Sequence, residues 1–179
     1  MNNFVFQNPT KLVFGKGEIK RLSKLIDKDK KILITYGGGS IKRNGVYEQV
    51  MQALEGYDIV EFSGIEANPD YSTLMKAVDI CKTQNIDFIL AVGGGSIIDG
   101  TKFIATAAKF EGEDAWDILS KKERLPKPMD FASVLTLPAT ASEMNNGAVI
   151  SRRDRQEKLA FHNPEGYPKF SILDPEVVL

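Results

Sequence analysis

The stretch LAVGGGSIIDG, from Leu90 to Gly100, places three consecutive glycines between two apolar runs. Glycine costs backbone entropy and contributes no side-chain packing, so such a run indicates that the backbone itself must come close to something. The apolar residues before the glycines are typical of a strand that is buried on both faces. The residues from Ile97 onward have helical spacing. The sequence therefore predicts a strand that ends in a tight turn, with a helix beginning directly after it.

The same alternation of strand and helix runs from about Lys31 to Thr140. Short apolar runs predict strands within residues 31–40, 57–64, 87–96 and 131–140. Helical spacing predicts intervening helices within residues 45–54, 71–84 and 97–110, the second of them capped by Asp70. This order is typical of an α/β fold with a doubly wound, Rossmann-like parallel sheet.

The segments on either side of this region are shorter and more varied. Residues 4–17 alternate apolar and polar side chains around the turn QNPT, which predicts an N-terminal β-hairpin. Helical spacing follows in residues 18–26, and residues 111–130 form a charged, proline-bearing connection with one helical turn at most. Residues 147–163 predict two strands around a polar turn, and residues 168–179 one more. No Ser/Gly-rich linker divides the chain, so we expect one domain over residues 1–179.

Composition excludes several classes of function. The formal net charge is −1, which gives no electrostatic reason to expect a nucleic-acid or membrane partner. The single cysteine, Cys81, lies in a helical pattern and is interpreted as a small core residue. The single histidine, His162, leaves no three-histidine metal site in this chain, and we interpret it as a histidine at the edge of a strand. We see no signal peptide or membrane span, so we expect a cytoplasmic protein.

The glycine turn Gly93, Gly94, Gly95 and Ser96 has the composition of a pyrophosphate cradle. A helix that begins at the carboxyl end of a parallel strand offers free backbone N–H groups and a partial positive charge to a phosphate. Ser96 and Asp99 also have the spacing of a capping box, so the pair has a second interpretation as a helix start. A tight turn without any ligand is a third.

A second glycine turn, Gly37, Gly38, Gly39 and Ser40, follows the strand predicted in residues 31–40. An acidic residue at such a turn often reads the ribose hydroxyls of NAD, whereas a turn without one accepts the 2′-phosphate of NADP. Lys42 and Arg43 follow this acid-free turn, which favours NADP(H), although both cations are also compatible with a solvated surface. After Pro138, the side chains of Thr140, Ser142, Asn145 and Asn146 either bond a ligand or cap a turn.

Several longer motifs, in this order along the chain, resemble one known family. They are NPTKLVFGKG near the start, ITYGGGSIKRNGV, GIEANPDYSTL, GGGSIIDGTKFIA, TLPATASEMNNGAVIS and the closing DPEVVL. The chain resembles the N-terminal domain of the iron-containing (group III) alcohol dehydrogenases, which have a dehydroquinate synthase-like fold. It is most similar to their NADPH-dependent branch of butanol dehydrogenases and aldehyde reductases. Ala141 stands where the family usually has glycine, and Gly38 stands where NAD-dependent members have Asp.

The resemblance implies a role for each matching residue. Gly37 to Ser40 would hold the ribose-phosphate end of the adenosine, and Gly93 to Ser96 the pyrophosphate. Asn68 would line the cofactor cleft, and Asp99 would lie near the nicotinamide ribose or amide. Thr140, Ser142 and Asn145 would contact the cofactor, and Lys158 would reach the ribose hydroxyls.

The resemblance also sets expectations for the rest of the enzyme. The family's iron or zinc is held by one Asp and three His of a helical C-terminal domain, which would follow this chain. We therefore expect no catalytic or metal-binding residue in this chain, no turnover of an alcohol or aldehyde by the chain alone, and a homodimer formed through the N-terminal hairpin. The alternatives are a nucleotide-binding module without turnover, an interaction fragment that binds no nucleotide, and a relative acting on a sugar or polyol phosphate, such as glycerol-1-phosphate dehydrogenase or dehydroquinate synthase.

Overall fold

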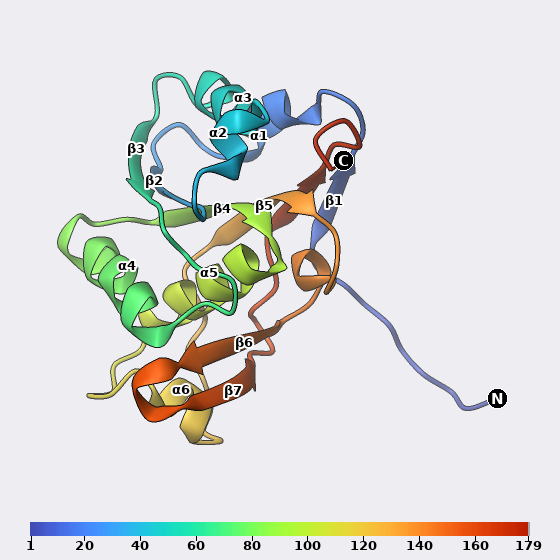
Figure 1. The fold of residues 1–179 in the computed structure, drawn as a ribbon. Coiled ribbons are helices and arrows are strands. Elements are labelled where there is room, and N and C mark those ends of the chain that lie inside the picture. Colours follow the sequence, from blue (N-terminus) through green and yellow to red (C-terminus); the bar gives the residue numbers. More distant parts are fainter. Residues whose placement is uncertain (179) are drawn as a thin grey trace.

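The computed structural model describes residues 1–178 and is built around one sheet of six parallel strands (Figure 1). In spatial order, the strands are β1 (Lys11–Phe14), β8 (Phe170–Leu173), β5 (Phe131–Leu137), β4 (Phe88–Gly94), β2 (Lys31–Thr35) and β3 (Asp58–Phe62). Every neighbouring pair is parallel. The predicted doubly wound α/β sheet is confirmed.

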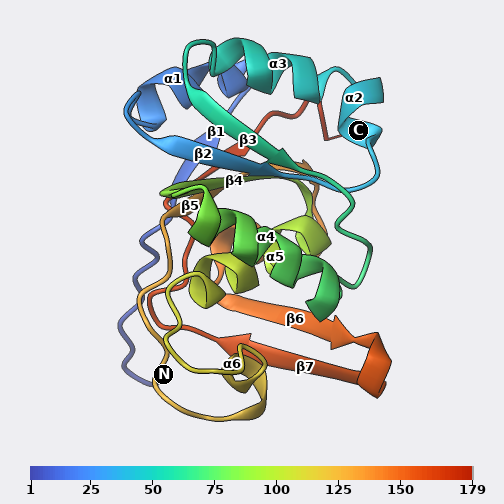
Figure 2. The ribbon, with the colours of Figure 1, turned by 90° about the vertical axis from the view of Figure 1, so that its left-hand side faces the viewer.

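Helices cover both faces of this sheet (Figure 2). One face carries η1 (Glu18–Arg21), α1 (Leu22–Leu25), α2 (Ser40–Arg43) and α3 (Val46–Ala53), and the other carries α4 (Tyr71–Thr83) and α5 (Gly95–Ala107). Alternate side chains of a strand point to opposite faces. Accordingly, Ile32 and Ile34 of β2 join the core under α3, whereas Leu33 joins the core under α4 and α5.

A β-hairpin forms a further layer on the outer side of α5 (Figure 2). It consists of β6 (Gly147–Arg152) and β7 (Glu157–His162), which pair antiparallel around the short helix η3 (Arg153–Arg155). The two predicted strands around a polar turn are thus confirmed. The single helical turn of the charged connection is α6 (Asp117–Ser120). No helix within residues 1–178 has the length and apolarity needed to cross a bilayer.

The N-terminal β-hairpin predicted for residues 4–17 is wrong. Only Lys11–Phe14 forms a strand, and it pairs in parallel with β8 rather than with the residues before the QNPT turn. Asn8 explains the change, because its amide donates to the carbonyl of Met144 (2.7 Å) while its Oδ1 accepts from the Thr10 N–H (3.0 Å). Residues 1–10 form no strand, and Phe4 and Phe6 are exposed.

Asp70 joins α4 to the β6–β7 hairpin. Its Oδ2 accepts from the backbone N–H (3.2 Å) and the hydroxyl (2.6 Å) of Ser72, which confirms the predicted N-cap. Its Oδ1 accepts from the backbone N–H of Arg153 (2.9 Å), whose guanidinium lies 3.3 Å away. Burial raises the pKa of Asp70, but the hydrogen bonds from Ser72 and Arg153 and the charge of Arg153 outweigh it, so the pKa lies below its ordinary value.

We expect Asp70→Ala to lower the free energy of unfolding by about 2 kcal/mol near neutral pH, because it removes a cap and a hairpin contact together. Asp79→Ala, on the exposed face of the same helix, is the matched control and should change it by less than about 0.5 kcal/mol. Urea unfolding followed by circular dichroism measures both.

The Asp70 contribution should also depend on pH in one direction. A carboxylate with a lowered folded pKa stabilises the protein above its unfolded pKa, and this stabilisation is lost as the pH falls through the folded value. The difference between Asp70→Ala and the unsubstituted chain should therefore shrink in acid. A difference that stays constant from neutral pH into acid would contradict the assigned role.

Candidate functional site

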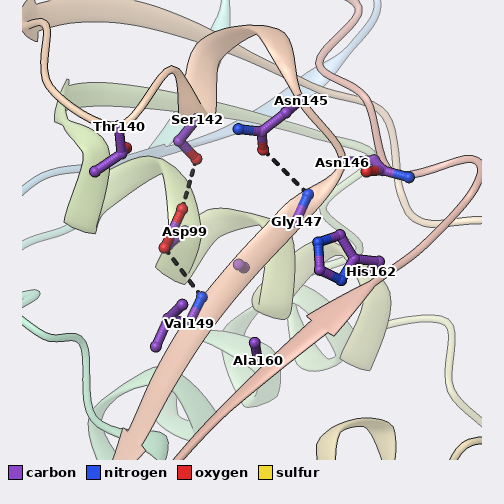
Figure 3. A pocket seen from close by; sticks show the side chains of 10 residues that line it. Asp99, Thr140, Ser142, Asn145, Asn146, Gly147, Val149, Ala160 and His162 are labelled. Atoms are coloured by element: carbon purple, nitrogen blue, oxygen red, sulfur yellow. Dashed lines mark hydrogen bonds between the residues drawn. The ribbon is translucent and has the colours of Figure 1, made fainter.

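Two hollows lie where the central strands end. The first hollow, of about 280 Å³, is lined by Gly37, Gly39, Ser40, Ile41, Asn44, Val92, Gly93, Gly94, Ile97, Thr136, Leu137 and Val177. The second hollow, of about 300 Å³, is lined by Asp99, Thr140, Ser142, Asn145, Asn146, Gly147, Ala148, Val149, Ala160 and His162 (Figure 3). The beginning of α5 contributes to both, through Ile97 and Asp99. Both glycine turns thus meet in the first hollow, and the segment after Pro138 lines the second.

Two of the three glycines at the start of α5, Gly93 and Gly95, leave no room for a Cβ beside neighbouring side chains. A Cβ on Gly93 would lie 2.5 Å from Cγ1 of Ile97, and one on Gly95 would lie 2.5 Å from Oγ1 of Thr140. The groups that come close to the backbone of this turn are therefore side chains of the protein itself. The contact between Gly95 and Thr140 brings the N-terminal end of α5 directly against the segment that follows β5.

The capping box, one of the interpretations of Ser96 and Asp99, is not formed. Helix α5 begins at Gly95, and its N-cap, Gly94, makes no side-chain capping bond. Asp99 instead reaches across to other elements: Oδ1 accepts from the hydroxyl of Ser142 (2.5 Å) and Oδ2 from the backbone N–H of Val149 (3.0 Å). Asp99 thereby joins α5 to the segment before β6 and to β6 itself (Figure 3).

Lys102, one turn further along α5, is a candidate site residue that the sequence analysis did not single out. Its side chain is buried, and Nζ donates to Ser142 Oγ (2.9 Å), Asn145 Oδ1 (2.8 Å) and the carbonyl of Gly147 (2.9 Å). Burial lowers its pKa to about 8, although the nearby carboxylates of Asp99 and Glu143 act to raise it. A signal was present, since Lys102 is the only lysine inside the apolar run of α5, where a charged side chain needs partners.

At the first glycine turn, two of the glycines are explained by the fold and one is not. A Cβ on Gly37 would lie 3.1 Å from the carbonyl of Ile65, and Gly39 has a φ of 100° as the N-cap of α2. Gly38 has open space around its missing Cβ and no positive φ. Nothing in the packing of residues 1–178 requires glycine at position 38.

Lys42 and Arg43 beside this turn are both exposed, and Lys42 also contacts two aromatic rings. The ammonium of Lys42 lies over the rings of Tyr36 and Tyr47, at 5.6 and 4.9 Å from their centroids. Both tyrosine hydroxyls donate to the carboxylate of Glu61 (3.0 Å each). Burial and these bonds raise the pKa of Tyr36 and Tyr47. The turn itself is free of acidic residues, as predicted. The carboxylate of Glu61 on β3 contacts Tyr36, the residue before the turn.

Asn68 and Lys158 meet each other rather than the residues of the two hollows. Lys158 Nζ donates to Asn68 Oδ1 (2.8 Å), and Asn68 has a φ of 53°. Arg153 holds this conformation by donating to the carbonyls of Ala67 and Asn68. Neither Asn68 nor Lys158 lines the first or the second hollow, and Ser96 does not line them either.

Cys81 lies in the core, as expected, and His162 lies at the end of a strand. Cys81 is a buried free thiol whose pKa burial raises to about 12. His162 is the last residue of β7 and lines the second hollow. Within residues 1–178, no three His, Cys, Asp or Glu side chains gather in a way that would hold a metal ion.

Comparison with known proteins identifies the family. The family profile described as iron-containing alcohol dehydrogenase matches residues 9–175. A probable NADH-dependent butanol dehydrogenase of Bacillus subtilis is 54% identical over 98% of this chain and 46% of that protein. The NADPH-dependent aldehyde reductase YqhD of Escherichia coli is 52% identical over 98% of this chain and 46% of that protein. The chain thus spans about half the length of these curated relatives.

Solved structures agree with the sequence relatives. The crystal structure of YqhD from Escherichia coli superposes with a TM-score of 0.95 at 51% identity, covering 99% of this chain and 46% of that one. The crystal structure of an NADH-dependent butanol dehydrogenase from Thermotoga maritima superposes with a TM-score of 0.94 at 44% identity, covering 99% of this chain and 46% of that one. The resemblance expected from the motifs is confirmed: the chain belongs to the iron-containing alcohol dehydrogenase family.

Proposed function

We propose that this chain is the NADP(H)-binding half of an alcohol dehydrogenase or aldehyde reductase. The observation that carries the proposal is the meeting of both glycine turns in one hollow, at the carboxyl ends of β2 and β4, beside a second, polar hollow. In open α/β sheets, nucleotides bind outside this edge. Family membership supports the same conclusion.

The residues of the two hollows fit the parts of a dinucleotide. In the first hollow, Gly93 and Gly94 lead into α5, a thirteen-residue helix whose free N–H groups suit a pyrophosphate. In the second hollow, Asp99 supplies an acceptor and Asn145 an amide, which suit the nicotinamide ribose or its carboxamide. Asn68 and Lys158, which contact each other, are assigned to the ribose hydroxyls by resemblance alone.

Gly38 supports NADP(H) over NAD(H). Because packing does not require glycine there, the missing side chain leaves space and no negative charge for a 2′-phosphate. The relatives quoted above include both NADH- and NADPH-dependent enzymes, so the preference needs its own measurement.

The bound cofactor would supply the hydride that passes to or from the substrate. This chain's part is to orient the nicotinamide ring through Asp99, Ser142 and Asn145 and to hold the phosphates at α5. The family name implies a metal, and residues 1–178 do not form a ligand set that fits one. We therefore assign no metal-dependent step to these residues, and we expect the chain alone to bind cofactor without turning over an alcohol or aldehyde.

A homodimer is the proposed assembly, now through the N-terminal arm, residues 1–7, rather than through a hairpin. The arm exposes Phe4, Val5 and Phe6, and the neighbouring edge strand β1 exposes Leu12 and Phe14. An unpaired edge with apolar side chains is a site for pairing with a second chain. A second copy of the chain would bury the apolar side chains of the arm and of β1.

The first test is a fluorescence titration of the chain with NADPH and, in parallel, with NADH. We expect saturable binding of both, with NADPH bound roughly tenfold more tightly because of the acid-free turn. Tighter binding of NADH would overturn the NADP(H) assignment, and no binding of either would overturn the proposed function.

Gly38→Asp should weaken NADPH binding by about tenfold or more and leave NADH binding unchanged or tighter, because the new carboxylate repels the 2′-phosphate. The open space at Gly38 should keep the fold intact. Gly38→Ala is the matched control, which adds a Cβ without charge and should keep the NADPH preference. Equal losses for both cofactors with Gly38→Asp would contradict the assigned role of this turn.

The dimer is tested by sedimentation equilibrium. We expect the unsubstituted chain to have the mass of a dimer and Phe4→Ser/Phe6→Ser to dissociate at micromolar concentration, since it removes most of the apolar surface of the arm. Asn2→Ser/Asn3→Ser, in the same arm, should leave the dimer intact. A monomer in every case would refute the assembly.

A further inference from the structure

The ammonium of Lys102 is buried beneath the second hollow, with all three of its N–H bonds directed at named acceptors. Its neighbours on α5, Thr101 and Phe103, are fully buried. Removing an ammonium from water is costly, and a methionine of similar length would pack there without that cost. The role of Lys102 must therefore be sought in how its three hydrogen bonds orient the groups that accept them.

The first consequence concerns Ser142. An ammonium only donates, so Ser142 Oγ accepts from Lys102, and the hydroxyl proton of Ser142 must point elsewhere. The acceptor in reach is Asp99 Oδ1, 2.5 Å away. Asp99 Oδ2 already accepts from the N–H of Val149. Lys102 thus fixes the direction of the serine hydroxyl, and through it the orientation of the Asp99 carboxylate at the hollow.

The second consequence concerns Asn145. The two ends of a carboxamide have nearly the same shape, and only their hydrogen bonds decide which end is oxygen. The oxygen of Asn145 faces Lys102 Nζ (2.8 Å) and the Gly147 N–H (3.1 Å), which are both donors. The NH₂ group is thereby turned toward the side of the hollow where Ser142 and Asp99 lie (Figure 3). Within residues 1–178, no protein acceptor bonds this NH₂ group.

We propose that Lys102 is a positioning residue that holds the Asn145 NH₂ group as donor and the Asp99 carboxylate as acceptor for a primary carboxamide in the second hollow. A primary carboxamide carries one acceptor and one donor, the complement of this pair. The nicotinamide ring bears such a group, so the inference rests on the proposed function and deepens it. In this role, Lys102 orients the nicotinamide, which is the reactive end of the cofactor.

The protonation of Lys102 gives this role a pH dependence. Burial lowers the pKa of Lys102 to about 8, and the charged groups that face it are Asp99 on α5 and Glu143 on η2 (Ser142–Met144). His162 on β7 lines the same hollow. The neutral amine has two N–H bonds for three acceptors, so above about pH 8 one of them loses its donor. The positioning is therefore present below the folded pKa and lost as the pH rises through it.

The test compares three ligands on the intact chain by competition titration. They are NADPH, its reduced 3-acetylpyridine analogue, in which an acetyl group replaces the carboxamide, and adenosine 2′,5′-bisphosphate, which lacks the nicotinamide end. We expect the unsubstituted chain to bind NADPH roughly tenfold more tightly than the acetyl analogue, because the analogue offers no NH₂ donor to Asp99.

Lys102→Met should lose most of this discrimination, while its affinity for adenosine 2′,5′-bisphosphate stays the same. Lys109→Met, which changes an exposed lysine just beyond α5, is the matched control and should behave like the unsubstituted chain. If Lys102→Met folds, binds the bisphosphate and still discriminates, the inference is overturned.

The unsubstituted chain provides a second readout that needs no variant. Between about pH 7 and 9.5, its affinity for NADPH should fall several-fold with a midpoint near the pKa of Lys102, and its affinity for the bisphosphate should stay flat. A flat NADPH profile would overturn the inference even if Lys102→Met did not fold. Binding of the bisphosphate without discrimination at any pH would overturn the inference and leave the nucleotide site standing, whereas no binding of any ligand would overturn the proposed function as well.

Discussion

The junction between β4 and α5 is the constraint on which the rest of the structure depends. The backbone at Gly95 lies so close to the side chain of Thr140 that a Cβ at position 95 would clash with the Thr140 hydroxyl. This approach places the first turn of α5 against the end of β5, so that one helix start contributes to both hollows. A bulkier residue at position 95 would push the segment after β5 outward and carry the second hollow with it.

On that side of the sheet, two separate groups of polar contacts join the helices to the hairpin and the segment before it. Asp99 contacts Ser142 and Val149, Lys102 contacts the segment from Ser142 to Gly147, and Asp70 joins α4 to the far end of the hairpin. Buried polar groups are stable only when their partners are in place. The hairpin is therefore positioned by a few directional bonds on one edge, in addition to apolar packing under α5.

Much of the fold was predictable from the sequence, because a parallel sheet leaves strong local signals. Continuous apolar runs such as Ile32 to Ile34 and the cap at Asp70 depend only on nearby residues. The failures share a different cause. The partner of β1 is β8, at the other end of the chain, and the alternation of Phe4 and Phe6 does not reveal which strand pairs with which.

The candidate site was predictable in its residue types and less so in its contacts. Both glycine turns and the segment after Pro138 do gather at one edge of the sheet, as their strand ends required. The spacing of Ser96 and Asp99 matched a capping box, yet Asp99 has better-placed donors in Ser142 and Val149, which are distant in sequence. In the sequence, Lys102 could be recognised only as a charged residue in an apolar run. Its three acceptors belong to Ser142, Asn145 and Gly147, which come after β5 and are distant in sequence.

The pairing of β1 with β8 has a consequence for how the chain reaches this structure. Strand β2 pairs with β3 and with β4, which are both close to it in sequence, whereas Lys11 of β1 pairs with Phe170, near the other end of the chain. The entropic cost of closing a loop grows only slowly with its length, but contacts between residues so far apart in sequence are slow to form. Strand β1 therefore depends on a partner from the other end of the chain, and β8 is the only strand of residues 1–178 that connects it to the rest of the sheet.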